Sequence, residues 1–203
     1  MTATTLGHVA TAAWACASLL WWASAASAQT RDGFHFGIGG GAGWATVTCE
    51  ECGDRDRQGG GSGYVTAGWT LNPHLVIGGD LQVWTRRDDL GAATQWSYRY
   101  IAAATATVYP SSRSGFFVKG GAGMSYVDLQ VDSPAGDADL DIDEGPGVLV
   151  AAGIDIPLGG RVALTPAIAY WHSWFDDLEA RGGAYETRRR QRVVVVTLGI
   201  TFP

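Results

Sequence analysis

After residue 28 the sequence lacks any apolar run long enough for a membrane-spanning helix, which takes about 20 residues. Charge is absent from the first 28 residues, which are rich in Ala, Leu and Trp and end in the small-residue pattern Ala26–Ala28. This pattern predicts a secretory signal peptide over residues 1–28, although no Lys or Arg precedes its apolar run. An uncleaved anchor helix is the alternative. If residues 29–203 lie in a membrane, they must therefore cross it as strands.

Cysteine is scarce, with three in the chain, one of them Cys16 within the leader. The other two, Cys49 and Cys52, form a C-x-x-C pattern. In an exported chain this spacing predicts a disulfide that tightens a loop. Zinc binding would need two further ligands, and none stands nearby in sequence, while redox chemistry is the reading for a reducing compartment. We expect neither a metal nor another cofactor.

The stretch from Gln95 to Tyr126 alternates with a period of two on both sides of a short turn. One face of its first half is apolar, with Trp96, Tyr98 and Tyr100 at one end. The other face is small and hydroxylated, with Ile101 as its one large apolar residue. This alternation predicts strands between lipid and a narrow polar lumen. A soluble lipocalin-like barrel is the alternative, but its outer face should carry many Lys and Glu.

Similar segments recur along the chain, and the connections between them differ in length. Long charged connections follow the first, third, fifth and seventh predicted strands, including Arg86–Thr94 and Asp128–Glu144, and short turns follow the others. The 175 residues after the leader suffice for about eight strands. Glycine, at 29 of 203 residues, is about twice its usual share of 7%, as a crowded small barrel requires. We predict an all-β fold, a closed eight-stranded antiparallel up-and-down transmembrane β-barrel.

Outward-facing aromatic residues fall in two bands, which is typical of membrane-interface girdles. Toward the long connections lie Trp44, Trp96, Tyr98, Tyr100, Tyr126 and Tyr170, and toward the short turns lie Phe34, Trp69, Phe116 and Phe202. On these features the chain after the leader resembles the small OmpA/OmpX-type outer-membrane β-barrels. The ending TLGITFP resembles the assembly signal of that family, but departs from it by placing Pro203 after the aromatic Phe202. The resemblance implies an outer-membrane location and no particular activity.

Six polar residues fall on the lumen-facing parity of the predicted strands: Asp80, Gln82, Arg99, Lys119, Asp155 and Arg161. Turn positions place Arg99 near Gln82, and Asp155 opposite Arg161. Unpaired charges in a narrow lumen are costly, so opposite signs should pair. We expect a static ion-pair network that fills the interior, with an ion gate as the alternative.

Two charged clusters adjoin the long connections. Arg188, Arg189, Arg190 and Arg192 precede the last strand, where guanidinium groups suit lipopolysaccharide phosphates, and ordinary rim charge is the equal alternative. The acidic segment Asp137–Glu144 repeats carboxylates every second residue, which indicates a solvated hairpin more than a calcium site, because the glycine of an EF-hand loop is absent.

A hydrolytic reading rests on His172 and Ser173. The two are adjacent, so they point to opposite faces of a strand, and no carboxylate is singled out to orient the histidine. We therefore expect a non-catalytic protein with a structural or surface-interaction role through its loops. A narrow pore is the second hypothesis, and a lipid A-modifying enzyme the third. Expected partners are outer-membrane lipid, lipopolysaccharide and possible surface-protein or host ligands at the loops, with no nucleic acid, and the barrel is expected to be a monomer.

Overall fold

The computed structural model describes residues 32–49, 53–54, 57–134, 136, 138–175 and 189–203. Eight long antiparallel strands form the fold: β1 (Gly33–Cys49), β3 (Gln58–Asn72), β4 (Leu75–Asp89), β5 (Thr94–Val108), β6 (Phe116–Asp132), β7 (Ala138–Ile154), β9 (Val162–Phe175) and β10 (Arg189–Phe202). Two short strands, β2 (Gly53–Asp54) and β8 (Ile156–Gly159), extend the sheet at its margins. No helix long and apolar enough to cross a membrane occurs in the described part of the chain.

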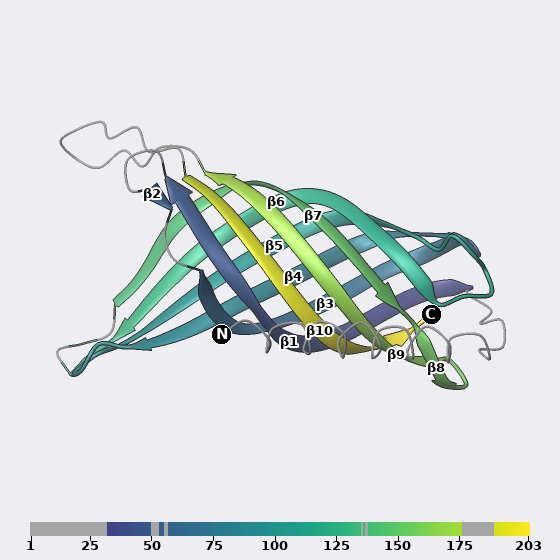
Figure 1. The fold of residues 1–203 in the computed structure, drawn as a ribbon, viewed down its shortest axis with the longest axis horizontal. Helices are drawn as coiled ribbons and strands as arrows, with labels where there is room; N and C mark the ends of the chain where they lie inside the picture. Colours follow the sequence, from purple (N-terminus) through teal and green to yellow (C-terminus); the bar gives the residue numbers. More distant parts are fainter. Residues whose placement is uncertain (1–31, 50–52, 55–56, 135, 137, 176–188) are drawn as a thin grey trace, which may run out of the picture.

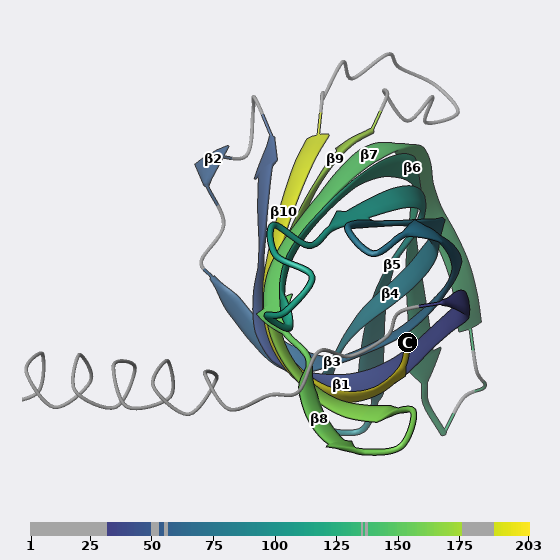
Figure 2. The ribbon, with the colours of Figure 1, turned by 90° about the vertical axis from the view of Figure 1, so that its right-hand side faces the viewer.

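The sheet closes on itself because the last long strand pairs with the first. Each long strand pairs with the next long strand along the chain, and β10 pairs with β1 from Phe36↔Phe202 to Cys49↔Arg189. Figure 2 shows the resulting ring of strands from the end that carries the C-terminus. The predicted closed eight-stranded up-and-down barrel is confirmed.

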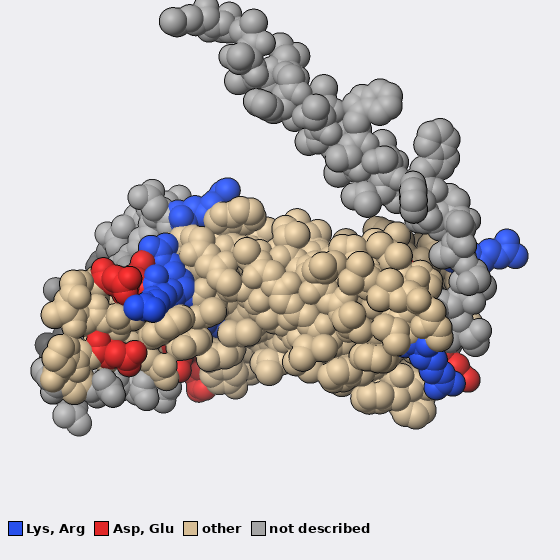
Figure 3. Space-filling view, turned by 90° about the horizontal axis from the view of Figure 1, so that it is seen from below, with Lys and Arg blue, Asp and Glu red and all other residues tan. Residues whose placement is uncertain are grey.

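Side chains alternate between the two faces of each strand, and the apolar ones are largely outside. On β5 the buried residues Ile101, Ala103 and Thr105 alternate with exposed alanines. Large aliphatic side chains on the outside stay exposed, such as Val196 and Leu198, each at 54%. In Figure 3 charged side chains gather toward the two ends of the barrel and leave a band between them. This inverted pattern suits a barrel whose outer surface meets lipid.

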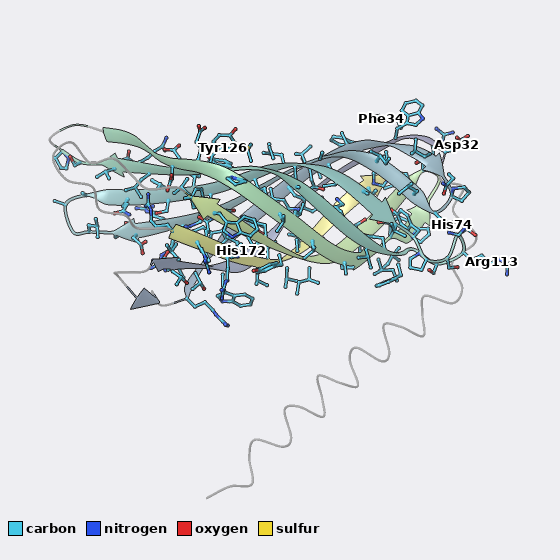
Figure 4. All side chains as sticks on the ribbon, turned by 90° about the horizontal axis from the view of Figure 1, so that it is seen from above. Asp32, Phe34, His74, Arg113, Tyr126 and His172 are labelled. Carbon is cyan, nitrogen blue, oxygen red and sulfur yellow. The ribbon has the colours of Figure 1, made fainter. Side chains whose placement is uncertain are left out.

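The two ends of the barrel differ. The turn end carries the connections at 73–74, 109–115 and 160–161, and the loop end carries the connection at 90–93 and the strand ends Cys49, Gln58, Asp132, Phe175 and Arg189. Figure 4 places Asp32, His74 and Arg113 at the turn end, whereas Tyr126 and His172 lie toward the loop end.

Two connections predicted as long loops are largely strand. β4 and β5 continue to Asp89 and from Thr94, and β6 and β7 continue to Asp132 and from Ala138. In the first hairpin, Arg86 and Arg87 pair with the carboxylates two residues further on, at 2.5 and 3.1 Å. Residues two apart share a strand face, so opposite charges neutralise each other there and the charged segment stays extended.

Glycine lets neighbouring strands approach closely inside the barrel, and Gly123 of β6 is the clearest case. A Cβ atom at this position would collide with the carbonyl oxygen of Ala102 on β5. We expect Gly123→Ala to lower the free energy of unfolding by about 1–3 kcal/mol, because backbone atoms have to shift. Urea titration of the folded barrel measures this loss. Gly120→Ala on the same strand meets no atom within 4 Å, so an equal loss in that control would contradict the argument.

Candidate functional site: a filled lumen and a cationic outer face

The lumen is closed near the turn end by a small apolar cluster. Val76, Tyr109 and Phe117 are buried there, and the Tyr109 and Phe117 rings lie 5.8 Å apart. The main chain of Tyr109 is held by the β3–β4 turn, since its N–H donates to the carbonyl of His74 at 2.9 Å. A tyrosine in a fixed turn thus reaches across this end of the barrel.

A polar layer lies next to this cluster and surrounds a cavity of about 30 Å³. Lys119 forms a buried ion pair with Asp80, whose other carboxylate oxygen accepts a hydrogen bond from Gln82 at 2.8 Å. Asp155 accepts hydrogen bonds from the Tyr109 hydroxyl at 2.8 Å and from the Thr165 hydroxyl at 2.7 Å. The cavity has room for about two water molecules, so it is a filled chamber and not a channel.

A larger apolar layer fills the lumen toward the loop end. Its two indole rings, Trp84 and Trp171, are fully buried, and the Trp84 Nε1 donates to the Gly43 carbonyl at 3.3 Å. The remaining members come from five strands and are Ala45, Ile101, Ala103, Leu149, Ala169, Val193 and Val195. Gly60 of β3 leaves room for the Trp84 ring, because a Cβ atom at this position would lie 2.6 Å from it.

Polar contacts bound this layer at the loop end. Arg99 donates to the Gln191 side-chain oxygen at 2.7 Å and lies 5.3 Å from the centre of the Trp84 ring. Ser173 donates to Ser125 at 2.6 Å, with both hydroxyls fully buried. The interior is therefore occupied along its length by layered side chains.

The structure brings together only part of the predicted lumen network. Asp80, Gln82 and Lys119 meet in one cluster. Arg99 does not join them: the hairpin turns at residues 90–93, which puts Arg99 opposite Trp84 and Gln82 opposite Ile101. The sequence predicted a hairpin that closes around Asp88–Leu90, which is about two residues too early.

The predicted approach of Asp155 to Arg161 requires the clearest correction. Arg161 is exposed at the turn end, whereas Asp155 is buried and bonds Thr165. The reason is the position of the turn, which lies at residues 160–161, about two residues later than the Asp155–Arg161 pairing requires, so that Ile156 lies opposite Leu164. The strand therefore aligns Asp155 with a residue four positions beyond Arg161.

The arginine cluster divides between the two faces of β10. Arg189 pairs with Asp143 at 2.7 Å, whereas Arg190 and Arg192 are exposed on a strand whose Gln191 and Val193 are buried. Arg188 lies outside the described residues. Alternation along the strand thus leaves two of the four predicted arginines on the outward face of the barrel.

Neighbouring strands complete this outward face. Arg192 lies opposite His172 of β9 and Thr46 of β1, and Arg190 lies opposite Trp174. The His172 and Trp174 rings meet edge to face at 4.4 Å. We call Arg190, Arg192, His172 and Trp174 the cationic outer face. The sequence suggested a hydrolytic role for His172 beside Ser173, whereas the β9–β10 register places His172 opposite Arg192.

Several further expectations concern residues near the loop end. Ser173 is buried against Ser125 while His172 faces outward, so the structure keeps this pair on opposite faces. The expected Cys49–Cys52 disulfide concerns residues outside the described side chains, as does most of the acidic segment 137–144, of which Asp143 binds Arg189. Among the side chains that are described, no three His, Cys, Asp or Glu residues form a group able to hold a metal ion.

Comparisons with known proteins point to one family. The family model described as "Outer membrane protein beta-barrel domain" matches residues 13–202. No curated protein matches the chain. Neisserial surface protein A (NspA) is 18% identical with a TM-score of 0.52, over 86% of this chain and 99% of that one. Ail of Yersinia pestis, in complex with the heparin analogue sucrose octasulfate, is 9% identical with a TM-score of 0.50, over 82% and 99%. At these identities the two structures show likeness of fold alone.

Proposed function

This chain belongs to the outer membrane protein β-barrel domain family, and we propose that it has a non-catalytic, structural or surface-interaction role in the outer membrane. In bacterial barrels of this kind short turns face the periplasm and longer loops face outside. The loop end is then the surface that meets the cell exterior. The proposal assigns the function to this end and to the outer rim beside it.

The observation that carries the proposal is the filled lumen. Trp84 and Trp171 are fully buried among aliphatic side chains, and the polar chamber below them measures only about 30 Å³. Small barrels of eight strands have interiors just wide enough to be filled by side chains. A solute would have to displace two indole rings to pass, so the interior favours a scaffold over a pore.

Catalysis is not part of the proposal. A hydrolytic site needs a nucleophile and a base within hydrogen-bond reach of each other. The Ser173 hydroxyl donates a hydrogen bond to Ser125 inside the barrel, and His172 contacts Tyr170 and Trp174 on the outside. The geometry therefore supports neither a serine hydrolase nor the lipid A-modifying activity weighed from the sequence.

A narrow pore is the second candidate, and one observation favours it. Lys119 of the Asp80–Lys119 pair lines the polar chamber, so a rearranged pair could line a path for ions. The Trp84 and Trp171 layer would still have to open, because it fills the lumen between this pair and the loop end.

Planar-bilayer recordings of the purified protein decide between the two functions. We expect no discrete conductance from the wild-type barrel and no increase from Asp80→Asn or Arg99→Gln, because the indole layer stays in place in both variants. A gated pore gives the opposite result: neutralising either charge raises the single-channel current. Discrete, voltage-dependent steps that grow in these variants would overturn the surface proposal.

A further inference from the structure

We propose that the cationic outer face binds the phosphate group of a phosphorylated glycolipid in the outer leaflet, with Arg190 and Arg192 as the anchoring residues and His172 as a third donor. The inference rests on the proposed surface role and names a partner for it. It differs from ordinary rim charge because it requires a defined set of donors from two strands.

The first argument is the position of the arginines relative to the apolar belt. Along the outward face of β10, Leu198, Val196 and Val194 come first, and the charged residues begin at Arg192. Val194 pairs across the sheet with Trp44 of β1 and with Tyr170 of β9, so these three residues form one cross-strand row. Aromatic residues of this kind mark the membrane–water interface. Arg192 is therefore one row beyond the interface, at the depth of lipid headgroups.

The second argument is the lack of internal partners. Arg86, Arg87 and Arg189 each form an ion pair, whereas Arg190 and Arg192 form none with the described residues. The two lie about 7 Å apart along one strand face, since each residue rises about 3.4 Å. Like charges so placed repel each other, and an anion between them relieves that repulsion. Guanidinium groups bind phosphate oxygens with paired hydrogen bonds, which makes phosphate the fitting anion.

The third argument is that His172 is held in place beside Arg192. Its Nδ1 lies 3.3 Å from the Tyr170 hydroxyl, and its ring packs edge to face with that of Trp174. When Tyr170 donates to Nδ1, the other ring nitrogen carries the proton and can donate to a phosphate oxygen. A neutral imidazole adds a donor without adding a third positive charge next to the two arginines.

A lipid fits this surface better than free phosphate. The side chains next to the arginines toward the barrel middle are apolar and open, with Trp44 at 47% exposed and Val196 at 54%. A ligand with a phosphate head and acyl chains can occupy both parts at once, because apolar contact and charge-assisted hydrogen bonds then add. Free phosphate contacts only the arginines and leaves the neighbouring apolar side chains uncovered.

The test measures binding of lipid A by native mass spectrometry, with the full-length protein in phosphatidylcholine nanodiscs. Wild-type protein is expected to bind bis-phosphorylated lipid A about tenfold more strongly than dephosphorylated lipid A, and R190Q/R192Q should lose this preference. His172→Ala should lose part of it. The matched control is R113Q/R161Q, which removes the same charge from two exposed arginines at the turn end and should retain the wild-type preference.

Three outcomes would overturn the inference. They are an unchanged preference in R190Q/R192Q, an equal loss in R113Q/R161Q, and displacement of lipid A by millimolar inorganic phosphate, which would indicate a site for free anions. Each outcome is separable from failure of the surface role, because that role is decided by conductance through the lumen, which these outward residues do not line.

Discussion

Replacing Trp171 with alanine is expected to lower the free energy of unfolding by about 3–5 kcal/mol, because it empties a fully buried site in the lumen. Trp171 belongs to the apolar layer with Trp84, Ile101 and Leu149. The surrounding side chains are attached to different strands of a closed sheet, so they can move only partly into the space left behind. The Trp171 Nε1 has no hydrogen-bond partner among the described residues. Removing this buried, unpaired donor stabilises the folded state and offsets part of the lost free energy.

Urea unfolding of the barrel, followed by tryptophan fluorescence and by mobility on gels run without boiling, measures this change. Trp174→Ala is the matched control, since it removes the same side chain from the same strand at a position that is 41% exposed on the outside. Trp174→Ala should lower the free energy of unfolding clearly less than Trp171→Ala does. Equal losses for the two variants would show that Trp171 does not pack in a layer that closes the lumen.

Lys119→Met is expected to cost a similar amount, about 3–5 kcal/mol, because it leaves the Asp80 carboxylate buried without its cation. The Asp80 side chain has no exposed surface, and the Lys119 side chain is 9% exposed, so water compensates little. Gln82 still donates one hydrogen bond to Asp80, which does not balance a full charge. The second variant, Asp80→Asn with Lys119→Met, removes both charges and should recover much of the loss.

The four proteins of this double-mutant cycle are compared in the same urea titrations. Arg87 and Asp89 supply the control, because they form an ion pair at 3.1 Å with side chains that are 55% and 71% exposed. Breaking that surface pair should cost less than about 1 kcal/mol. A double variant as unstable as Lys119→Met alone would mean that Lys119 contributes by packing and not by its charge.

Alternation within a strand could be predicted from the sequence, and partners across strands could not. The sequence places Asp80, Arg99 and Lys119 on the inward face, and the structure has all three buried. It does not determine which of them meet, because a shift of two residues in a hairpin keeps the parity and changes every neighbour. The observed β4–β5 register moves Arg99 away from the Asp80 cluster and over the Trp84 ring.

The cationic outer face likewise depends partly on alternation within a strand and partly on pairing between strands. Alternation along β10 is sufficient to separate Arg189, which points inward to Asp143, from the outward-facing Arg190 and Arg192. The position of His172 next to Arg192 depends on the pairing of β9 with β10, and the position of Trp44 depends on the closure of β10 onto β1. These contacts join residues that are about 20 and 150 positions apart in the chain, so no local pattern contains them.

By itself, the sequence determined the period-two strands, their number, the lipid-facing apolar surface and the closed barrel, because each depends on side-chain alternation and chain length. Only the tertiary structure decided the layered plug of the lumen, the Asp80–Lys119 pair across an intervening strand, and the cationic outer face. The physical reason is that closing a barrel staggers its strands by a fixed amount, and this stagger sets which side chains share a level.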